Sequence, residues 1–262
     1  MLAWGRLRGA VVVLDHLEPL TTLDAFAARM GDDGTWTGGF DLPFGLPREL
    51  VAQLGWPQQW EACMRHYAAL DRASIRATFA AFCDARPAGA KFAHRACDVP
   101  AGSSPSMKWV NPPVAYMLHA GVTRLLDAGL VLPGLHPLNW ERLVMDAMQR
   151  VALEAYPGLL AREILGRRSY KSDDVAKQTP DRLIARKDLL AALETGQTRL
   201  NLRLKLTAAQ HDALVADGSG DTLDAVLCMV QAAWGQLRRE AGDIWYGLPP
   251  DLDPLEGWIV SV

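Results

Sequence analysis

The sequence predicts an α/β fold, and three consecutive segments near its amino terminus indicate this. Residues 10–14 form the Val-rich run Ala-Val-Val-Val-Leu, which is typical of a buried or half-buried strand. Thr22 is a suitable N-cap for residues 23–30, whose apolar side chains recur at helical spacing. A second β-prone run ends at Asp41, where Leu-Pro-Phe-Gly breaks the chain. The order strand, helix, strand favours an α/β sandwich.

The rest of the chain alternates helical and short strand patterns. Residues 47–85 predict three helices, separated at Pro57 and capped at the third by Asp71. Residues 86–113 are rich in Pro and Gly and predict a long loop, which is more often functional than idle. The sequence contains no internal repeat, so we expect a single domain over 1–262 with a helical insertion at about 47–128. The other expected elements are helices at 113–128, 158–165, 181–194, 207–216 and about 220–240, and short strands at 130–132 and 151–153.

Composition bounds the class of protein. The 262 residues are 50% hydrophobic and 22% charged, as in ordinary globular domains, and the net charge of -3 gives no basic footprint of a dedicated nucleic-acid binder. The four cysteines form no C-x-x-C pair, so we expect buried free thiols. We find no signal-peptide pattern and no apolar run of the ~18 residues that a membrane span needs. We therefore expect a cytoplasmic protein with no membrane partner.

Acidic side chains recur where predicted strands end and where the last helix begins. Asp41 and Glu154 each follow a strand-like run, and Asp221 and Asp224 are three residues apart at a helix start, so they share a face. Mg²⁺ and Mn²⁺ prefer oxygen ligands, and two such ions can clamp the oxygens of a phosphodiester. We therefore predict that Asp41, Glu154, Asp221 and Asp224 converge as a catalytic Mg²⁺ or Mn²⁺ site.

Each of these acids also has a purely structural explanation. Asp41 before Leu-Pro suits a turn, and Glu154 suits a solvated strand end. Asp221 is a good N-cap residue, and Asp224 suits the first turn of a helix because of the helix dipole.

Basic side chains could supply phosphate contacts. Lys91 and Arg95 lie in the long loop, and Arg182 and Arg186 share a helix face at i, i+4. Ordinary solvated surface is the alternative interpretation for all four.

Several short motifs resemble a known family. In chain order they are Gly-Phe-Asp-Leu-Pro-Phe-Gly-Leu-Pro ending at Pro47, Glu154-Ala-Tyr-Pro-Gly, Tyr170-Lys171-Ser-Asp, Gly220-Asp-Thr-Leu-Asp-Ala, and Glu256-Gly-Trp-Ile. Together they span nearly the whole chain and resemble domain-of-unknown-function family 429, predicted nucleases with an RNase H-like fold. The resemblance implies a mixed sheet with helices on both faces and acids gathered at one sheet edge for metal-dependent cleavage.

The resemblance assigns roles residue by residue. Asp41 matches the second acidic position, Glu154 is an additional strand-end acid, and Asp221 with Asp224 match the helix position. Tyr170 and Lys171 match the family's Tyr-Lys pair, which implies a catalytic Lys171 and a substrate-binding Tyr170. The expected function is a metal-dependent nuclease acting on DNA or RNA. The alternative is a non-catalytic nucleic-acid- or protein-binding module on a degenerate nuclease fold.

The chain departs from that pattern at its first strand. RNase H-like chains open with a hairpin whose first strand carries an essential Asp, whereas residues 2–4 here resemble the second strand and residues 10–14 the third. Without a central first strand, the strand at Asp41 would keep a bare edge, which invites pairing. We therefore expect either that residues 11–14 pair directly with the Asp41 strand or that the protein forms a homodimer through that edge.

Overall fold

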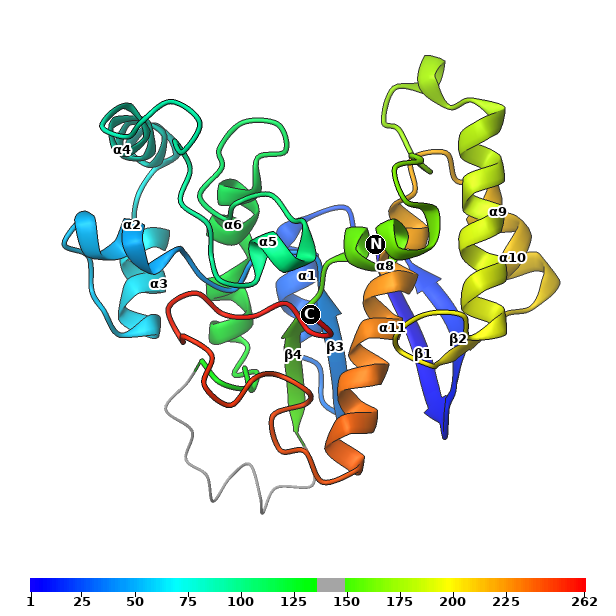
Figure 1. The fold of residues 1–262 in the computed structure, drawn as a ribbon. Helices are drawn as coiled ribbons and strands as arrows, with labels where there is room; N and C mark the ends of the chain where they lie inside the picture. The colour runs from blue at the N-terminus through cyan, green and yellow to red at the C-terminus, as the bar shows by residue number, and fades with distance from the viewer. Residues whose placement is uncertain (136–148) are drawn as a thin grey trace.

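The computed structural model describes residues 1–135 and 149–262, and it is an α/β structure with two small sheets (Figure 1). The first sheet has the order β1-β2-β5, with β1 (Leu2–Arg8) antiparallel to β2 (Val11–Glu18), and β5 (Arg203–Lys205) parallel to β2. The second sheet pairs β3 (Trp36–Phe40) with β4 (Arg150–Glu154) in parallel. The long helix α11 (Asp221–Glu240) packs against β1, β2 and β3, so it joins the two sheets.

The parallel pair β3–β4 places two of the predicted site residues at one end of a sheet. Phe40 lies opposite Glu154 in the register, and Asp41 follows Phe40 directly. Asp41 and Glu154 therefore lie at the same end of this two-stranded sheet.

Most of the remaining helices lie between β3 and β4, as the predicted insertion requires. They are α2 (Arg48–Gln53), α3 (Trp60–Ala68), α4 (Arg72–Asp84), α5 (Asp98–Ala101) and α6 (Val114–Asp127). The apolar faces of α2, α3, α4 and α6 meet in one core, where the rings of Tyr67 and Phe79 stack at 5.9 Å and the indole of Trp60 donates to the Phe44 carbonyl. Helix α5 instead contributes Ala101 to a small cluster with Leu159 and Ile259. The four cysteines are buried free thiols, as expected.

A second core lies under the first sheet. It is built from α8 (Pro157–Leu165), α9 (Pro180–Thr195) and α10 (Ala208–Ala216) together with α11, and the short 3₁₀ helix η1 (Val175–Lys177) precedes α9. Helix α1 (Leu23–Met30) connects the two sheets, and the Thr22 hydroxyl caps it by accepting a hydrogen bond from the Ala25 amide. Asp71 caps α4 in the same way through Ser74. Among the described residues, no helix is both long and apolar enough to cross a membrane.

The structure corrects two sequence predictions. The strand expected at 130–132 is a single bridge from Val131 to Val151, and α5 lies inside the predicted loop. The strand β5 has only three residues, too few for a recognisable pattern.

The expected single mixed sheet is divided in two, and the expected pairing of 11–14 with the Asp41 strand is wrong. Residues 11–14 already have two neighbours, because β2 pairs with β1 on one side and β5 on the other. Within residues 1–135 and 149–262, no strand lies between the edges of β1 and β3 that border the same cavity.

Candidate functional site

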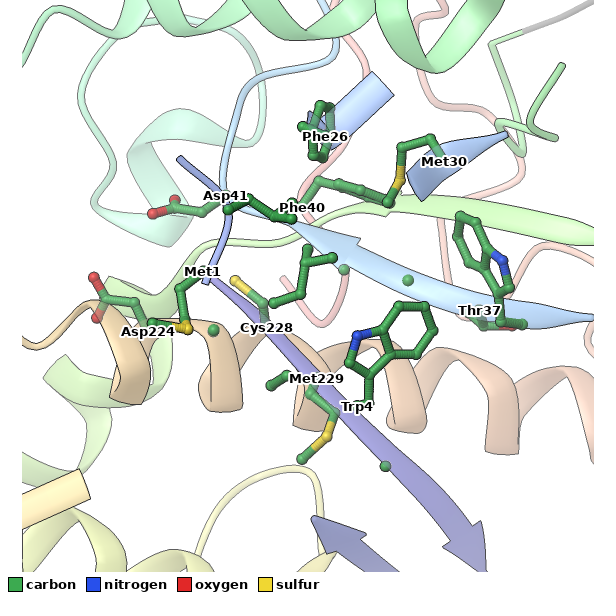
Figure 2. A pocket seen from close by; sticks show the side chains of 18 of the residues that line it. Met1, Trp4, Phe26, Met30, Thr37, Phe40, Asp41, Asp224, Cys228 and Met229 are labelled. Carbon is green, nitrogen blue, oxygen red and sulfur yellow. The ribbon is translucent and has the colours of Figure 1, made fainter. Parts of the chain in front are cut away.

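A cavity of about 770 Å³ separates β1 from β3. Helix α11 lies on one side of it and α1 on the other, with Cys228 and Met229 opposite Phe26 and Met30 (Figure 2). Three of the four predicted acids, Asp41, Asp221 and Asp224, line this cavity. Asp41 and Asp224 lie at the same end of it, although 183 residues separate them in the sequence (Figure 2).

Solvent reaches Asp41 at the mouth of the cavity. Protein atoms nevertheless lie around its carboxylate and displace part of the surrounding water. Partial desolvation is the largest cause that raises its pKa from 3.8 to about 7, and repulsion from Asp224 adds to it. Within the described part of the chain, no group donates a hydrogen bond to the Asp41 carboxylate. Asp41 is therefore a carboxylate that is available to a ligand and carries a proton for part of the time at neutral pH.

Asp224, in the first turn of α11, has two donors. The Tyr170 hydroxyl donates to Oδ1 at 2.5 Å, and the Lys171 ammonium donates to Oδ2. Desolvation raises the pKa of Asp224, while Lys171 and Tyr170 oppose that rise. Burial lowers the pKa of Lys171, but attraction to Asp224 outweighs this and leaves that pKa raised. The pair thus keeps a cation beside Asp41.

The start of α11 is built to let Lys171 approach. Gly220 has φ of +77°, and a Cβ at this position would lie 2.7 Å from the Lys171 Cβ. Only glycine fits both the left-handed conformation and the close contact. The Asp217 carboxylate orders the same turn by accepting hydrogen bonds from Ser219 and Thr222, and its pKa falls to about 2.

Glu154 is close enough to Asp41 to raise its pKa slightly, yet its carboxylate is engaged elsewhere. Arg95 donates to both of its oxygens, at 2.7 and 2.8 Å, and the Phe44 amide donates at 2.9 Å. Arg95 also binds Asp98, and all three side chains are buried. Arg95 is therefore an internal partner of Glu154, and this position gives it no surface for a phosphate.

The other basic residues lie in different places. Lys91 is exposed in the loop after α4, apart from the cavity that holds Asp41. Arg182 lines a second, shallow pocket with Arg168. Arg186 is buried and donates to the carbonyls of Val215 and Tyr170, so it fixes Tyr170 rather than facing solvent.

The sequence predictions include Arg186 and Gly220 but do not indicate their roles in the structure. The positioning role of Arg186 has no sequence signal, because a buried arginine on a helix has the same spacing as an exposed one. Gly220 could have been recognised, since a glycine directly before an acidic helix start often marks a close approach.

A metal ion fits this site only in part. Within the described residues, no three His, Cys, Asp or Glu side chains are grouped so that they could hold a metal ion. Mg²⁺, however, is usually bound by one or two carboxylates together with water and substrate phosphates. Asp41 has no internal hydrogen-bond donor among the described residues and is a carboxylate of this kind, and Asp221, exposed at the start of α11, lines the same cavity.

Three comparisons with known proteins identify no relative. No protein-family model matches the chain, and neither the curated proteins nor the solved structures contain a significant match.

Proposed function

We propose that the protein is a metal-dependent nuclease that hydrolyses phosphodiester bonds at the acidic end of the cavity. The observation that carries the proposal is the meeting of Asp41 and Asp224, from distant chain segments, in one cavity (Figure 2), where Lys171 binds the Asp224 carboxylate. The resemblance to a family of predicted nucleases supports the same conclusion.

Asp41 and Asp221 would hold one Mg²⁺ or Mn²⁺, which would neutralise charge on the scissile phosphate when bound. Glu154 has no role in this proposal, because Arg95 already engages its carboxylate. The proposal thus needs fewer carboxylate ligands than the four that the sequence predicts.

The protein's own side chains would bind and orient the phosphate. Lys171 is half exposed, so its ammonium can contact a phosphate oxygen while Asp224 holds it in place. Tyr170 is a positioning residue, since its hydroxyl fixes the Asp224 carboxylate. The positive charge of a bound ion would favour the ionised form of Asp41 and oppose the rise in its pKa that desolvation and Asp224 cause.

The alternative, a binding module without catalysis, is favoured by one observation. Lys171 and Tyr170 satisfy Asp224 internally, as they would in a structural ion pair. A non-catalytic module would bind nucleic acid without cleaving it.

The test is cleavage of end-labelled single-stranded DNA and RNA with Mg²⁺, with Mn²⁺ and with EDTA. We expect cleavage that requires the metal and falls at least about 100-fold in Asp41→Asn, as for loss of a group that acts in the transition state. Asp33→Asn, which removes an exposed carboxylate from the α1–β3 loop, is the matched control and should retain activity. Equal cleavage by Asp41→Asn and wild type would remove Asp41 from the mechanism.

A further inference from the structure

The pocket that contains Arg182 lies between the segment before Tyr170 and the start of α9. Its volume is about 390 Å³, which is within the range of ligand pockets, roughly 300–1,000 Å³. Most of its lining side chains are polar or charged, and two are arginines. The lining consists of Arg168, Ser169, Thr179, Asp181, Arg182 and Ile184.

The guanidinium of Arg182 has no acceptor within residues 1–135 and 149–262. Its Nη1 atom is shielded from solvent and makes no hydrogen bond, although the side chain as a whole is half-buried. A guanidinium is always charged and carries five N–H donors, so partial burial without an acceptor is unfavourable. An anion in the pocket would supply both the opposite charge and the acceptors that this group lacks.

Arg168 is the second cation, and α9 holds it beside the pocket. Its Nη1 donates to the Asp188 carboxylate at 2.6 Å, while 52% of the side chain stays exposed, so further N–H donors remain available to a ligand. Helix α9 also begins at this pocket, and the Thr179 side chain makes no capping hydrogen bond there. The first turn of α9 therefore adds the partial positive charge of a helix N-terminus.

One carboxylate in the pocket opposes an anion. Asp181 lies in the first turn of α9 and lines the pocket, and no ion pair engages it within the described part of the chain. Its negative charge makes the affinity for an isolated anion modest, so tight binding requires further contacts elsewhere on the same ligand. Removal of this charge should strengthen binding.

The pocket and Lys171 belong to one short segment. Ser169 lines the pocket, and its hydroxyl donates to the Lys171 carbonyl at 3.1 Å. Arg168 precedes Lys171 by three residues, so their Cα atoms are at most about 11 Å apart. Successive phosphates of one nucleic-acid strand advance about 3.4 Å along a duplex axis, so a few nucleotides cover this distance.

We propose that the pocket between residues 168–169 and the start of α9 binds a backbone phosphate of a nucleic-acid strand, a few nucleotides from the phosphate at Lys171. Arg182 would pair with this phosphate, and Arg168 with the start of α9 would orient it. The choice of nucleic acid as the source of the phosphate rests on the proposed function, and it applies equally to a nuclease and to a binding module.

The test measures binding without cleavage. Fluorescence anisotropy of a labelled oligothymidylate with the full chain in EDTA reports affinity, so a failure of the proposed nuclease activity leaves this result unaffected. Arg182→Gln should weaken binding about threefold or more at low salt. It should also reduce the slope of log affinity against log salt by about 0.7, as for one phosphate contact on a single strand.

Lys187→Gln is the matched control, because it removes the same charge from an exposed position on a different face of α9. It should keep the wild-type slope. Asp181→Asn changes an exposed side chain and should strengthen binding about twofold or more, an effect that a purely structural Arg182 does not produce.

Inorganic phosphate separates the two sources of the ligand. It should raise the unfolding midpoint of wild type relative to chloride at equal ionic strength, and it should leave Arg182→Gln unchanged. Equal salt slopes for wild type and Arg182→Gln would overturn the proposal, as would unchanged binding by Asp181→Asn. Stabilisation by inorganic phosphate without binding of the oligonucleotide would assign the pocket to a free phosphate and would also overturn it.

Discussion

Replacing Asp41 with Asn removes a carboxylate whose charged form the protein disfavours. The pKa of this group rises from 3.8 to about 7, because desolvation and Asp224 both oppose its ionisation. Because the pKa of Asp41 is higher in the folded protein, the folded protein binds more protons than the unfolded chain between pH 3.8 and about pH 7. Stability is therefore lost as the pH rises through this window, and the loss is complete above pH 7.

The magnitude follows from the pKa difference. At about 1.4 kcal/mol for each pH unit, the full difference from 3.8 to about 7 would correspond to roughly 4 kcal/mol. Water reaches Asp41 at the cavity mouth, so screening reduces the expected penalty to about 1–2 kcal/mol at pH 8. Asparagine has the same shape and no charge, and the substitution removes this penalty.

The assay is urea unfolding of wild type, Asp41→Asn and the control Asp33→Asn at pH 4 and pH 8. We expect Asp41→Asn to be about 1–2 kcal/mol more stable than wild type at pH 8 and nearly equal to it at pH 4. The control should follow the wild type at both pH values. If Asp41→Asn were less stable than wild type at pH 8, the charged Asp41 carboxylate would be stabilising. That result would refute the claim that desolvation and Asp224 disfavour its charged form.

Three further predictions concern the groups around Asp41. Arg95→Met leaves Glu154 buried without its cation and should lower the free energy of unfolding by about 3–5 kcal/mol in urea titrations, whereas a loss below 1 kcal/mol would show that the pair is dispensable. Tyr170→Phe removes a donor from the buried Asp224 and should cost about 1–3 kcal/mol in the same assay, and an unchanged midpoint would mean that water replaces the hydroxyl. At pH 8, Mg²⁺ at 100 times its Kd should stabilise the wild type by about 2.7 kcal/mol but not Asp41→Asn, and equal stabilisation of both proteins would place the ion elsewhere.

The local elements could be predicted because their signals are local. Residues 23–30 have an N-cap and a helical apolar face, and the structure places α1 at Leu23–Met30. The three helices after Pro47 and the long final helix were recognisable for the same reason. The three-residue β5 and the separation of the two sheets could not be predicted, since strand pairing joins segments that have no sequence signal for each other.

The candidate site was predictable in its acids but not in their partners. Strand-end and helix-start settings indicated Asp41, Asp221 and Asp224, and these residues line one cavity. Glu154 has the same kind of setting, yet the long loop brings Arg95 to it. That contact spans 59 residues, so neither helical nor strand periodicity indicates it.

The central claim is that the acidic end of the cavity binds a divalent cation. Electron paramagnetic resonance of Mn²⁺ measures this directly, because free Mn²⁺ gives a sharp signal that is lost on binding. Titration of the full chain at pH 8 should show one bound ion per chain in wild type and in Asp33→Asn, and at least tenfold weaker binding in Asp41→Asn. Equal Mn²⁺ binding by wild type and Asp41→Asn, or no binding by any of the three proteins, would contradict the claim.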